Sequence, residues 1–438
     1  MPDRIDDAAA PPLAGAEPPR GFFLVRHLGI DTRPLRESPP FRRLFVGQAI
    51  SYIGGEITFV AIPIQLYRLT HSTLQVGLLS LSMLFPLLVA PLVGGAVADA
   101  IDRRKMLLVT EAGVALTSVG LAANAFLAHP RVWALYALAA VGTAVFSFGL
   151  PALRALLPRI VAEDQIVAAS ALEGTYHNFA AVAGPAAGGL VIAGIGYTGT
   201  YLIDVGTFAV SLASIWFLPP IPPAPDAERA SLRSIVDGFR YVRTKRELLG
   251  IFLVDTNAMI FGMPMALFPA LGVHFGGASK ATDSLYTGFL YAAPYVGALA
   301  ASAFSGALSE VRRQGRWVIV AASLWGAALT LFGFADAFWL ALALLAVAGA
   351  ADFVSAVLRS AILLTATPDD MRGRMSGIEF AQVASTPSLG NLEAGVVASV
   401  TSLRTSIVSG GLACVAGSAV LAVAIPELWH YDAKAAAA

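Results

Sequence analysis

Residues 94–105 read GGAVADAIDRRK and place five charged side chains, from Asp99 to Lys105, within twelve positions. The rest of the chain is poor in charge, since 13% of its 438 residues are charged and 57% are hydrophobic. Soluble domains contain about 45–50% apolar residues. A charged stretch between two long apolar runs is typical of a loop at a membrane surface that joins two spanning helices. We therefore expect lipid to be the solvent of most of this chain.

Long apolar runs recur along the whole sequence. A hydrocarbon layer of ~30 Å requires about 20 helical residues, and lipid offers no partner to backbone groups outside a helix or a closed barrel. Twelve runs reach this length, and each is predicted to be a helix. They lie roughly at residues 44–67, 75–98, 106–127, 133–153, 167–194, 199–218, 249–273, 284–308, 317–335, 338–361, 378–401 and 405–425.

The positions of lysine and arginine agree with this map. Cytoplasmic segments of membrane proteins accumulate these residues. With the N-terminus in the cytoplasm, only four of the 29 lie on the other side of the membrane, namely Arg68, Arg131, Lys280 and Arg404. The sequence thus predicts an all-α, multi-pass protein of the cytoplasmic membrane, with twelve spans and both termini in the cytoplasm.

The longest connection between apolar runs divides the chain into two halves of six helices. Five apolar residues recur at helical spacing inside it, among charged residues, which predicts an amphipathic helix on the membrane surface. These residues are Leu232, Ile235, Val236, Phe239 and Val242. The predicted parts are a cytoplasmic tail at 1–40, a six-helix bundle at 41–218, a cytoplasmic linker at 219–248, a second bundle at 249–426 and a tail at 427–438.

The two halves share features in the same order, which indicates an internal repeat. Secondary transporters are built from such repeats. Gly95, Asp99 and the basic residues after Asp99 match Gly306, Glu310 and Arg313. Arg154 matches Arg359. Pro185 and Gly188 match Pro387 and Gly390.

The opening stretch resembles motif A of the major facilitator superfamily, in which a glycine is followed four residues later by an aspartate and then by a basic cluster. Gly95, Asp99, Arg103 and Arg104 match this motif, whereas Ala100 and Asp102 replace its usual basic residue and glycine. The resemblance implies a fold of two pseudo-symmetric bundles. It also implies a latch that holds the cytoplasmic side closed, formed by Gly95, Asp99, Arg103, Arg104, Glu111, Glu310 and Arg313.

Residues 184–189, GPAAGG, resemble motif C of the same superfamily, which is associated with antiporters and exporters. Gly184, Pro185, Gly188 and Gly189 carry the match, although alanines replace two glycines that precede the motif in the family. This resemblance favours export over import.

Three further stretches are similar to the bacterial enterobactin exporter subfamily, whose members move catecholate siderophores out of the cell. They are VAIPIQLYRLTHSTLQVGL at 60–78, FLYAAPYVGA at 289–298 and TPDDMRGRMSG at 367–377. The resemblance implies export of a siderophore or a similar amphiphilic metabolite across the inner membrane by a monomer, with a lipid bilayer, protons and a small molecule as partners. Related drug and macrolide exporters share these stretches, so multidrug or macrolide efflux is the alternative. A membrane scaffold or receptor that kept the fold is a third possibility.

Transport against a gradient needs a group that alternates between a charged and a neutral form. A charge at the bilayer centre costs about 2.5–3.5 kcal/mol, so a carboxyl group there has reason to exchange a proton. Glu56, about twelve residues into the first helix, is the main candidate for proton coupling, with Asp352 and Asp255 as further candidates. The alternative for Glu56 is a buried carboxylate held by a hydrogen bond. The alternatives for the aspartates are structural roles, for Asp255 near a helix end and for Asp352 beside Arg359.

Polar and aromatic side chains in or near the spans are candidates for substrate binding, although each of them is as readily explained by packing. They are Gln65, Tyr176, His177, Asn257, Tyr291, Tyr295 and Gln382. The sequence GIGYTG at 194–199 fits a dinucleotide motif but follows no predicted strand, and no phosphate-binding loop occurs. We expect no enzyme activity, metal, cofactor or nucleic acid.

Overall fold

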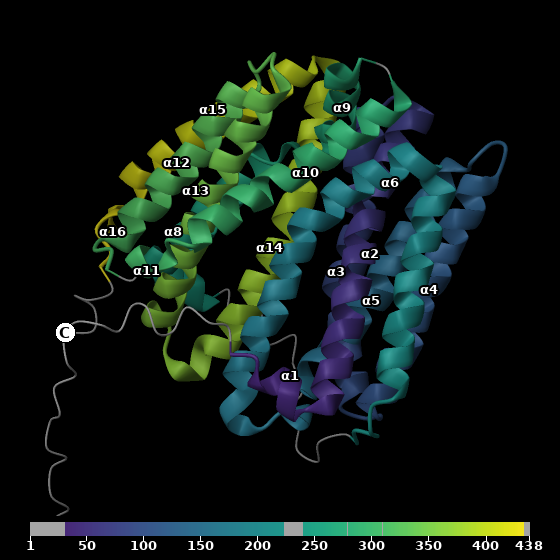
Figure 1. Ribbon diagram of the computed structural model, residues 1–438. Coiled ribbons are helices and arrows are strands. Elements are labelled where there is room, and N and C mark those ends of the chain that lie inside the picture. The colour runs from purple at the N-terminus through teal and green to yellow at the C-terminus, as the bar shows by residue number, and fades with distance from the viewer. Residues whose placement is uncertain (1–30, 223–239, 278, 309, 433–438) are drawn as a thin grey trace, which may run out of the picture.

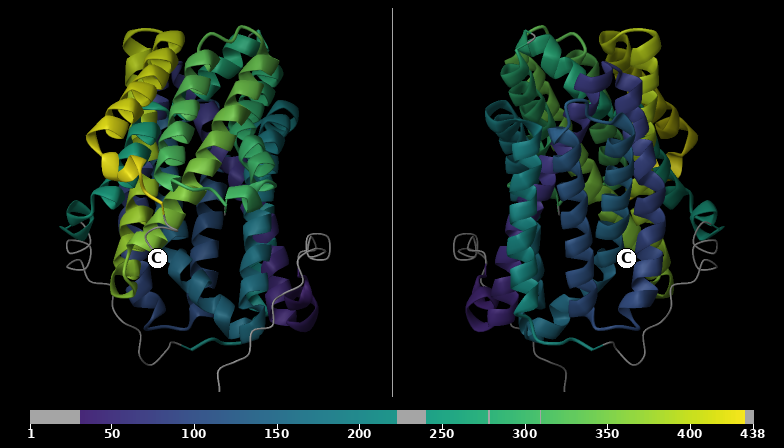
Figure 2. Two further views of the ribbon diagram at one scale, coloured as in Figure 1. Left: turned by 90° about the vertical axis from the view of Figure 1, so that its left-hand side faces the viewer. Right: turned by 90° about the vertical axis from the view of Figure 1, so that its right-hand side faces the viewer.

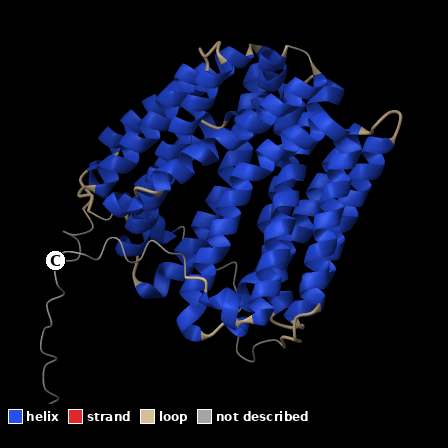
Figure 3. Ribbon diagram, viewed as in Figure 1, coloured by secondary structure: helices blue, strands red, loops and turns tan. Residues whose placement is uncertain are grey.

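The computed structural model describes residues 31–222, 240–277, 279–308 and 310–432, which are helical with short loops and contain no strand (Figures 1 and 3). The helices of the first half are α1 (Arg33–Glu37), α2 (Pro39–Thr70), α3 (Thr73–Ala98), α4 (Arg103–Phe126), α5 (Val132–Ile160), η1 (Glu163–Gln165) and α6 (Ile166–Trp216). Those of the second half are α8 (Arg246–Phe261), η2 (Pro264–Leu267), α9 (Phe268–Gly276), α10 (Lys280–Ser302), α11 (Ser305–Leu308), α12 (Gln314–Phe332), α13 (Phe338–Ala366), α14 (Asp369–Val400), α15 (Leu403–Ala424) and α16 (Pro426–Trp429).

Nine stretches of the described residues are long and apolar enough to span a membrane. One of them, Glu163–Trp216, has 54 residues and is too long for one crossing at ~1.5 Å per residue. It reverses at Gly196, whose φ of 73° is not helical. Helices α10 and α14 are also long, but polar residues interrupt their apolar runs. The polytopic all-α fold is therefore confirmed, whereas the count of twelve spans stays a prediction.

The two halves lie side by side and meet along two pairs of helices (Figure 1). Helix α3 packs against α14, and α6 packs against α10. Within the first half, α6 packs along α2 and α4, and within the second half α12 and α10 pack along α13. Figure 2 shows from both sides that the long helices run in similar directions, with α1 at the end opposite to the loops around α9.

Described residues of both predicted tails pack on the adjoining halves. Helix α1 belongs to the first half, because Gln165 donates to the Glu37 carboxylate at 2.5 Å and Ser38 donates to the carbonyl of Ile160. Residues up to 432 pack on the second half, where Tyr431 contacts Thr365 at 3.0 Å. Of the predicted amphipathic helix, residues 232–239 lie outside the described part of the chain.

Three hydrophobic clusters show how the halves are joined. One cluster contains residues of both halves, among them Leu66 and Tyr201 with Phe268 and Leu290. It lies toward the end that holds the loop at 71–72 and Gly277, here called the closed end. The end that holds α1 and α16, here called the open end, has a separate cluster for each half, around Leu156 in the first half and around Leu248 and Val318 in the second. The halves thus share a core only toward the closed end.

Glycines bring the backbones of the two halves into direct contact toward the closed end. A Cβ atom on Gly288 of α10 would lie 2.5 Å from the carbonyl oxygen of Pro185, and one on Gly189 would lie 2.6 Å from that of Ser284. On the other helix pair, a Cβ on Gly77 of α3 would lie 2.7 Å from a backbone oxygen of α14. Small residues allow such close helix packing in membranes. Any larger side chain at these positions would separate the halves.

We expect Gly288→Val to open the closed end. Ser284, which is 1% exposed, is replaced by cysteine, and the rate at which a membrane-impermeant maleimide labels this cysteine is measured. The native Cys414 is buried and gives the background rate. The rate should rise at least fivefold with Gly288→Val. Gly206→Val is the matched control, since a Cβ there has no neighbour within 4 Å. Equal labelling rates in the two variants would contradict this account of the interface.

Candidate functional site

A buried ion pair joins the two halves at the closed end. The guanidinium of Arg68, at the end of α2, lies 3.4 Å from the carboxylate of Asp283 on α10, and it also donates to the carbonyl of Lys280 at 2.5 Å. The side chains of the pair are 18% and 7% exposed. The hydroxyl of Thr73 adds a bond to the carbonyl of Gly395 at 3.1 Å. These polar contacts must break if the closed end is to open.

The GPAAGG segment packs α6 against one helix of each half. A Cβ on Gly184 would lie 2.3 Å from the Cβ of Glu56, and one on Gly188 would lie 3.3 Å from the carbonyl oxygen of Ile57, both on α2. Gly189 and Pro185 contact α10 of the other half, as described above. The segment therefore fixes the position of Glu56 relative to the interface between the halves.

Glu56 is partly exposed and makes no hydrogen bond or ion pair with any residue that the structure describes. It lines a cavity together with Tyr52, one helical turn earlier on α2. The alternative of a Glu56 held by a hydrogen-bonding partner is therefore not seen in this conformation. A carboxyl group in this position is free to exchange a proton or to contact a bound molecule.

Asp255 and Asp352 differ from Glu56 in their surroundings. Asp255 is 4% exposed and forms an ion pair with Arg359 at 2.7 Å, which joins α8 to α13. Arg359 also donates to the hydroxyl of Ser355 at 2.8 Å. Asp352 makes no hydrogen bond or ion pair among the described residues. The arginine thus pairs with the aspartate of the neighbouring helix rather than with the one on its own helix.

The residues expected to form the latch contact their own half in this conformation. Asp102 caps α4, where its carboxylate accepts from the backbone N–H of Arg104 at 2.9 Å. The side chain of Arg104 donates to the carbonyl of Trp216 and lies over its ring, 5.7 Å from the centroid. The backbone N–H of Arg103 donates to the carbonyl of Ile221 at 3.1 Å. The basic cluster therefore holds the end of α6 and the residues after it.

Glu111 and the glycines of the expected latch have other neighbours in this conformation. Glu111 makes no ion pair with Arg103 or Arg104, and its carboxylate accepts from the amide of Gln48 at 2.7 Å. A Cβ on Gly95 would meet nothing within 4 Å, whereas one on Gly94 would lie 2.1 Å from the carbonyl oxygen of Phe148. In the second half, Glu310 is exposed and Arg313 has a left-handed backbone with φ of 55°.

Four of the residues expected to bind substrate instead bond to neighbouring helices. Gln65 accepts from the hydroxyl of Tyr201 at 2.8 Å, and Asn257 donates to the carbonyl of Cys414 at 2.8 Å. The hydroxyl of Tyr291 donates to the carbonyl of Met265 at 2.9 Å. Gln382 likewise donates to the carbonyl of Phe252 at 2.7 Å. In this conformation these polar groups bond within the protein, whereas no such hydrogen bond engages Tyr176, His177 or Tyr295 among the described residues, and substrate contact by any of the seven stays a prediction.

Tyr176 and His177 belong to an aromatic cluster between α2 and α6. The rings of these two residues stack with centroids 4.5 Å apart, and that of His177 meets Tyr52 edge-on at 4.1 Å. Phe45 contacts Tyr176 at 5.4 Å. The sequence analysis missed Tyr52 and Phe45, although the spacing of four residues between Tyr52 and Glu56 places both on one helical face.

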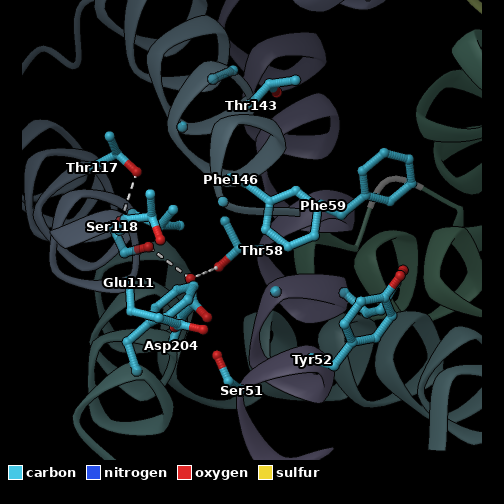
Figure 4. A pocket seen from close by; sticks show the side chains of 18 of the residues that line it. Ser51, Tyr52, Thr58, Phe59, Glu111, Thr117, Ser118, Thr143, Phe146 and Asp204 are labelled. Carbon is cyan, nitrogen blue, oxygen red and sulfur yellow. Dashed lines mark hydrogen bonds between the residues drawn. The ribbon is translucent and has the colours of Figure 1, made fainter. Parts of the chain in front are cut away.

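A cavity of about 320 Å³ lies inside the first half, between α2, α3, α4, α5 and α6 (Figure 4). We call it the first-half cavity. Its lining includes Glu56, Glu111 and Asp204. Asp204 is 1% exposed and accepts from the hydroxyls of Thr58 and Ser118, both at 2.7 Å. The sequence analysis did not predict a cavity here.

The chain matches known transporters over nearly all of its length. The family described as transmembrane secretion effector matches residues 31–438. The enterobactin exporter EntS of Escherichia coli strain K12 is 31% identical over 399 residues, which cover 91% of this chain and 94% of that protein. The exporter of the same name from Shigella dysenteriae strain Sd197 gives the same identity and coverage.

Solved structures with a similar fold are also transporters. The nucleoside transporter NupG has a TM-score of 0.67 at 14% identity and covers 90% of this chain and 100% of its own. A bacterial homologue of the lysosomal transporter Spinster has a TM-score of 0.66 at 14% identity and covers 93% and 98%. At these identities the likeness shows the fold alone. With the family match and the exporter relatives, this chain belongs to the transmembrane secretion effector family and is a multi-pass membrane transporter, not an enzyme, with the major facilitator fold.

Proposed function

We propose that this transporter exports a siderophore or a similar amphiphilic metabolite in exchange for protons, by alternating access. The observation that carries the proposal is the position of Glu56. It has no partner among the described residues, and it packs against Gly184 of the motif associated with exporters. That motif also contacts the other half, and the interface between the halves is closed at one end only. The identity to an enterobactin exporter over 91% of the chain supports the direction and the class of cargo.

The way in which the halves are joined supports alternating access. Rigid bundles that share a core toward one end can rock about that contact, so that the other end closes as this one opens. The ion pair between Arg68 and Asp283 then acts as the gate of the closed end. The basic cluster at Arg103 and Arg104 and the acidic Asp99 are at the open end, where a latch between the halves would form in the opposite state.

The distribution of positive charge supports an open end that faces the cytoplasm. Arg68, Arg131, Lys280 and Arg404 belong to loops or helix ends of the closed end, and most of the other lysines and arginines that the structure describes lie toward the open end. Cytoplasmic segments are enriched in these residues. The described conformation is then the one that receives cargo from the cell, with both chain ends in the cytoplasm.

In this proposal Glu56 carries the exchanged proton. No described residue pairs with it, it lies in membrane where charge is costly, and it contacts the α6 segment that joins both halves. Asp352, which also lacks a partner in the described part of the chain, is the second candidate. Asp255 has a smaller part, since its charge is already compensated by Arg359.

Multidrug or macrolide efflux is the second candidate function, and the mainly apolar lining of the first-half cavity favours it. A drug susceptibility panel separates it from siderophore export. Metabolite profiling of cells that lack the protein, grown under iron limitation, also separates the two functions. A siderophore retained inside these cells would identify the cargo.

We expect Glu56→Gln to abolish proton coupling and to leave exchange intact. Uptake of labelled enterobactin into inverted vesicles under an imposed pH gradient should fall at least tenfold, because the amide cannot release a proton. Exchange of labelled for unlabelled enterobactin without a gradient should stay within twofold of the unchanged protein.

The control for this variant is Glu393→Gln, which removes a partly buried carboxylate of α14 that does not line the first-half cavity. It should transport normally. Gradient-driven uptake that is unchanged by Glu56→Gln would exclude Glu56 as the coupling residue. Absence of any enterobactin uptake by the unchanged protein would exclude this cargo.

We also expect Gly184→Ala to displace Glu56 and to destabilise the fold. The new methyl group would overlap the side chain of Glu56, and overpacking of this kind costs about 1–3 kcal/mol. Gly174→Ala on the same leg of α6 is the matched control, since its Cβ meets nothing within 4 Å. In detergent, the melting temperature should fall for Gly184→Ala and should hold or rise for Gly174→Ala. A melting temperature that falls equally in both variants would contradict the proposed contact.

A further inference from the structure

We propose that Trp216 and Trp429 are positioning residues for the change between the two conformations of the transporter. Each holds an arginine of its own half while the open end is open, and releases that arginine when the open end closes. Trp216 is the last residue of α6, and Trp429 is the last residue of α16. This role rests on the proposed alternating access, but not on the cargo or on the coupling ion.

The same contact between an arginine and a tryptophan occurs in both halves. The guanidinium of Arg104 lies 5.7 Å from the ring centroid of Trp216, and that of Arg316 lies 5.5 Å from the ring centroid of Trp429. The two arginines are 212 positions apart, and the two tryptophans are 213 positions apart. Gly95 and its counterpart in the internal repeat are 211 positions apart. The contact is therefore a further feature of this repeat.

Each arginine belongs to a stretch that the end of its own half also holds by polar contacts. These stretches are residues 99–105 and 310–316, here called the basic segments. In the first, the carboxylate of Asp102 accepts from the backbone N–H of Ile221 at 3.2 Å. In the second, Arg312 forms an ion pair with Asp432 at 3.5 Å. The residues at and after each tryptophan thus attach a basic segment to its own half.

Packing fixes the position of Trp429 in the second half. The preceding residue, Leu428, is completely buried. A Cβ atom on Gly315 of α12 would collide with the carbonyl oxygen of Leu428, and one on Gly250 of α8 would lie 2.9 Å from its side chain. The backbones of α12 and α16 are therefore in direct contact, and this contact places Trp429 beside Arg316.

The hold on each arginine is weak enough to be released. Neither Arg104 nor Arg316 forms an ion pair within the described part of the chain, and the other partner of Arg104 is the carbonyl of Trp216. The side chain of Trp216 is 62% exposed. An exposed contact of a cation with an aromatic ring changes an equilibrium by about two- to fivefold. Such a contact can bias two conformations without locking either of them.

The opposite half offers carboxylates that compete for the basic segments. Thr73 at the start of α3 bonds to Gly395 near the end of α14, so these helices run in opposite directions. The start of α14 at Asp369, whose side chain is 87% exposed, therefore lies toward the same end as the first basic segment. Helices α6 and α10 are likewise antiparallel, and Glu163 and Asp164 precede α6. When the open end closes, each basic segment approaches carboxylates of the other half.

The test measures the distance between spin labels at Val167→Cys and Gly373→Cys, two exposed positions of the open end, in full-length protein in nanodiscs. Trp216→Leu should raise the short-distance population at least twofold, because Arg104 is then free to reach the other half. Trp429→Leu should act in the same direction. Trp216→Phe retains an aromatic face and should restore the original population.

A double variant separates this role from anchoring in the membrane, since tryptophans at the membrane surface also anchor helices. If Trp216 acts through Arg104, Trp216→Leu has no further effect in the Arg104→Gln protein. Trp133→Leu is the matched control, because Trp133 is 71% exposed and no arginine lies over its ring among the described residues. It should leave the population unchanged.

Two results would overturn the positioning role. One is a short-distance population that Trp216→Leu leaves unchanged, and the other is an equal rise with and without Arg104. Arg68→Glu tests the underlying rocking in the same preparation. If the population grows with Arg68→Glu but not with Trp216→Leu, the positioning role alone is wrong. If neither variant changes it, alternating access is wrong as well.

Discussion

The structure depends on direct backbone contact between its two halves toward the closed end. At Gly189 and Gly288 the two helices α6 and α10 approach so closely that a single methyl group would collide with a carbonyl oxygen. The shared hydrophobic cluster surrounds this contact, and the ion pair of Arg68 with Asp283 seals it. Because each half keeps its own core toward the open end, the contact is suited to serve as a pivot. The same α6 segment fixes Glu56, because a Cβ on Gly184 would lie 2.3 Å from the Cβ of Glu56.

Charge is compensated differently in the two halves, although they have related folds. The second half pairs Asp255 with Arg359 inside the protein. Within the described residues, the first half leaves Glu56 unpaired, and it leaves one oxygen of Glu111 without a donor. Uncompensated carboxylates in a membrane are costly, so their presence has to be balanced by a proton or by a bound cation. Asp352 of the second half also lacks a partner among the described residues, so each half contains an unpaired carboxyl group that can respond to a proton.

Much of the fold could be predicted from the sequence, because hydrophobic length and the placement of lysine and arginine constrain a membrane protein strongly. The reversal between 194 and 199 and the importance of Gly184 were visible there too. What the sequence could not give was the direction of each side chain around its helix axis. Gln65 and Gln382 were expected in a substrate site but bond to neighbouring helices in this conformation. Pairs between distant helices, such as Asp255 with Arg359, have no signal in a single sequence.

The central claim is that the two halves rock as rigid bodies about the contact of α6 with α10 at Gly189 and Gly288. The most direct measurement uses spin-label distances at both ends of the protein in lipid, at Leu127 and Thr401 for the closed end and at Val167 and Arg372 for the open end. Arg68→Glu replaces the attraction to Asp283 by repulsion. Rocking predicts that this change lengthens the closed-end distance and shortens the open-end distance in the same preparation. A longer closed-end distance with an unchanged open-end distance would mean local separation of the helix ends, and it would contradict the account.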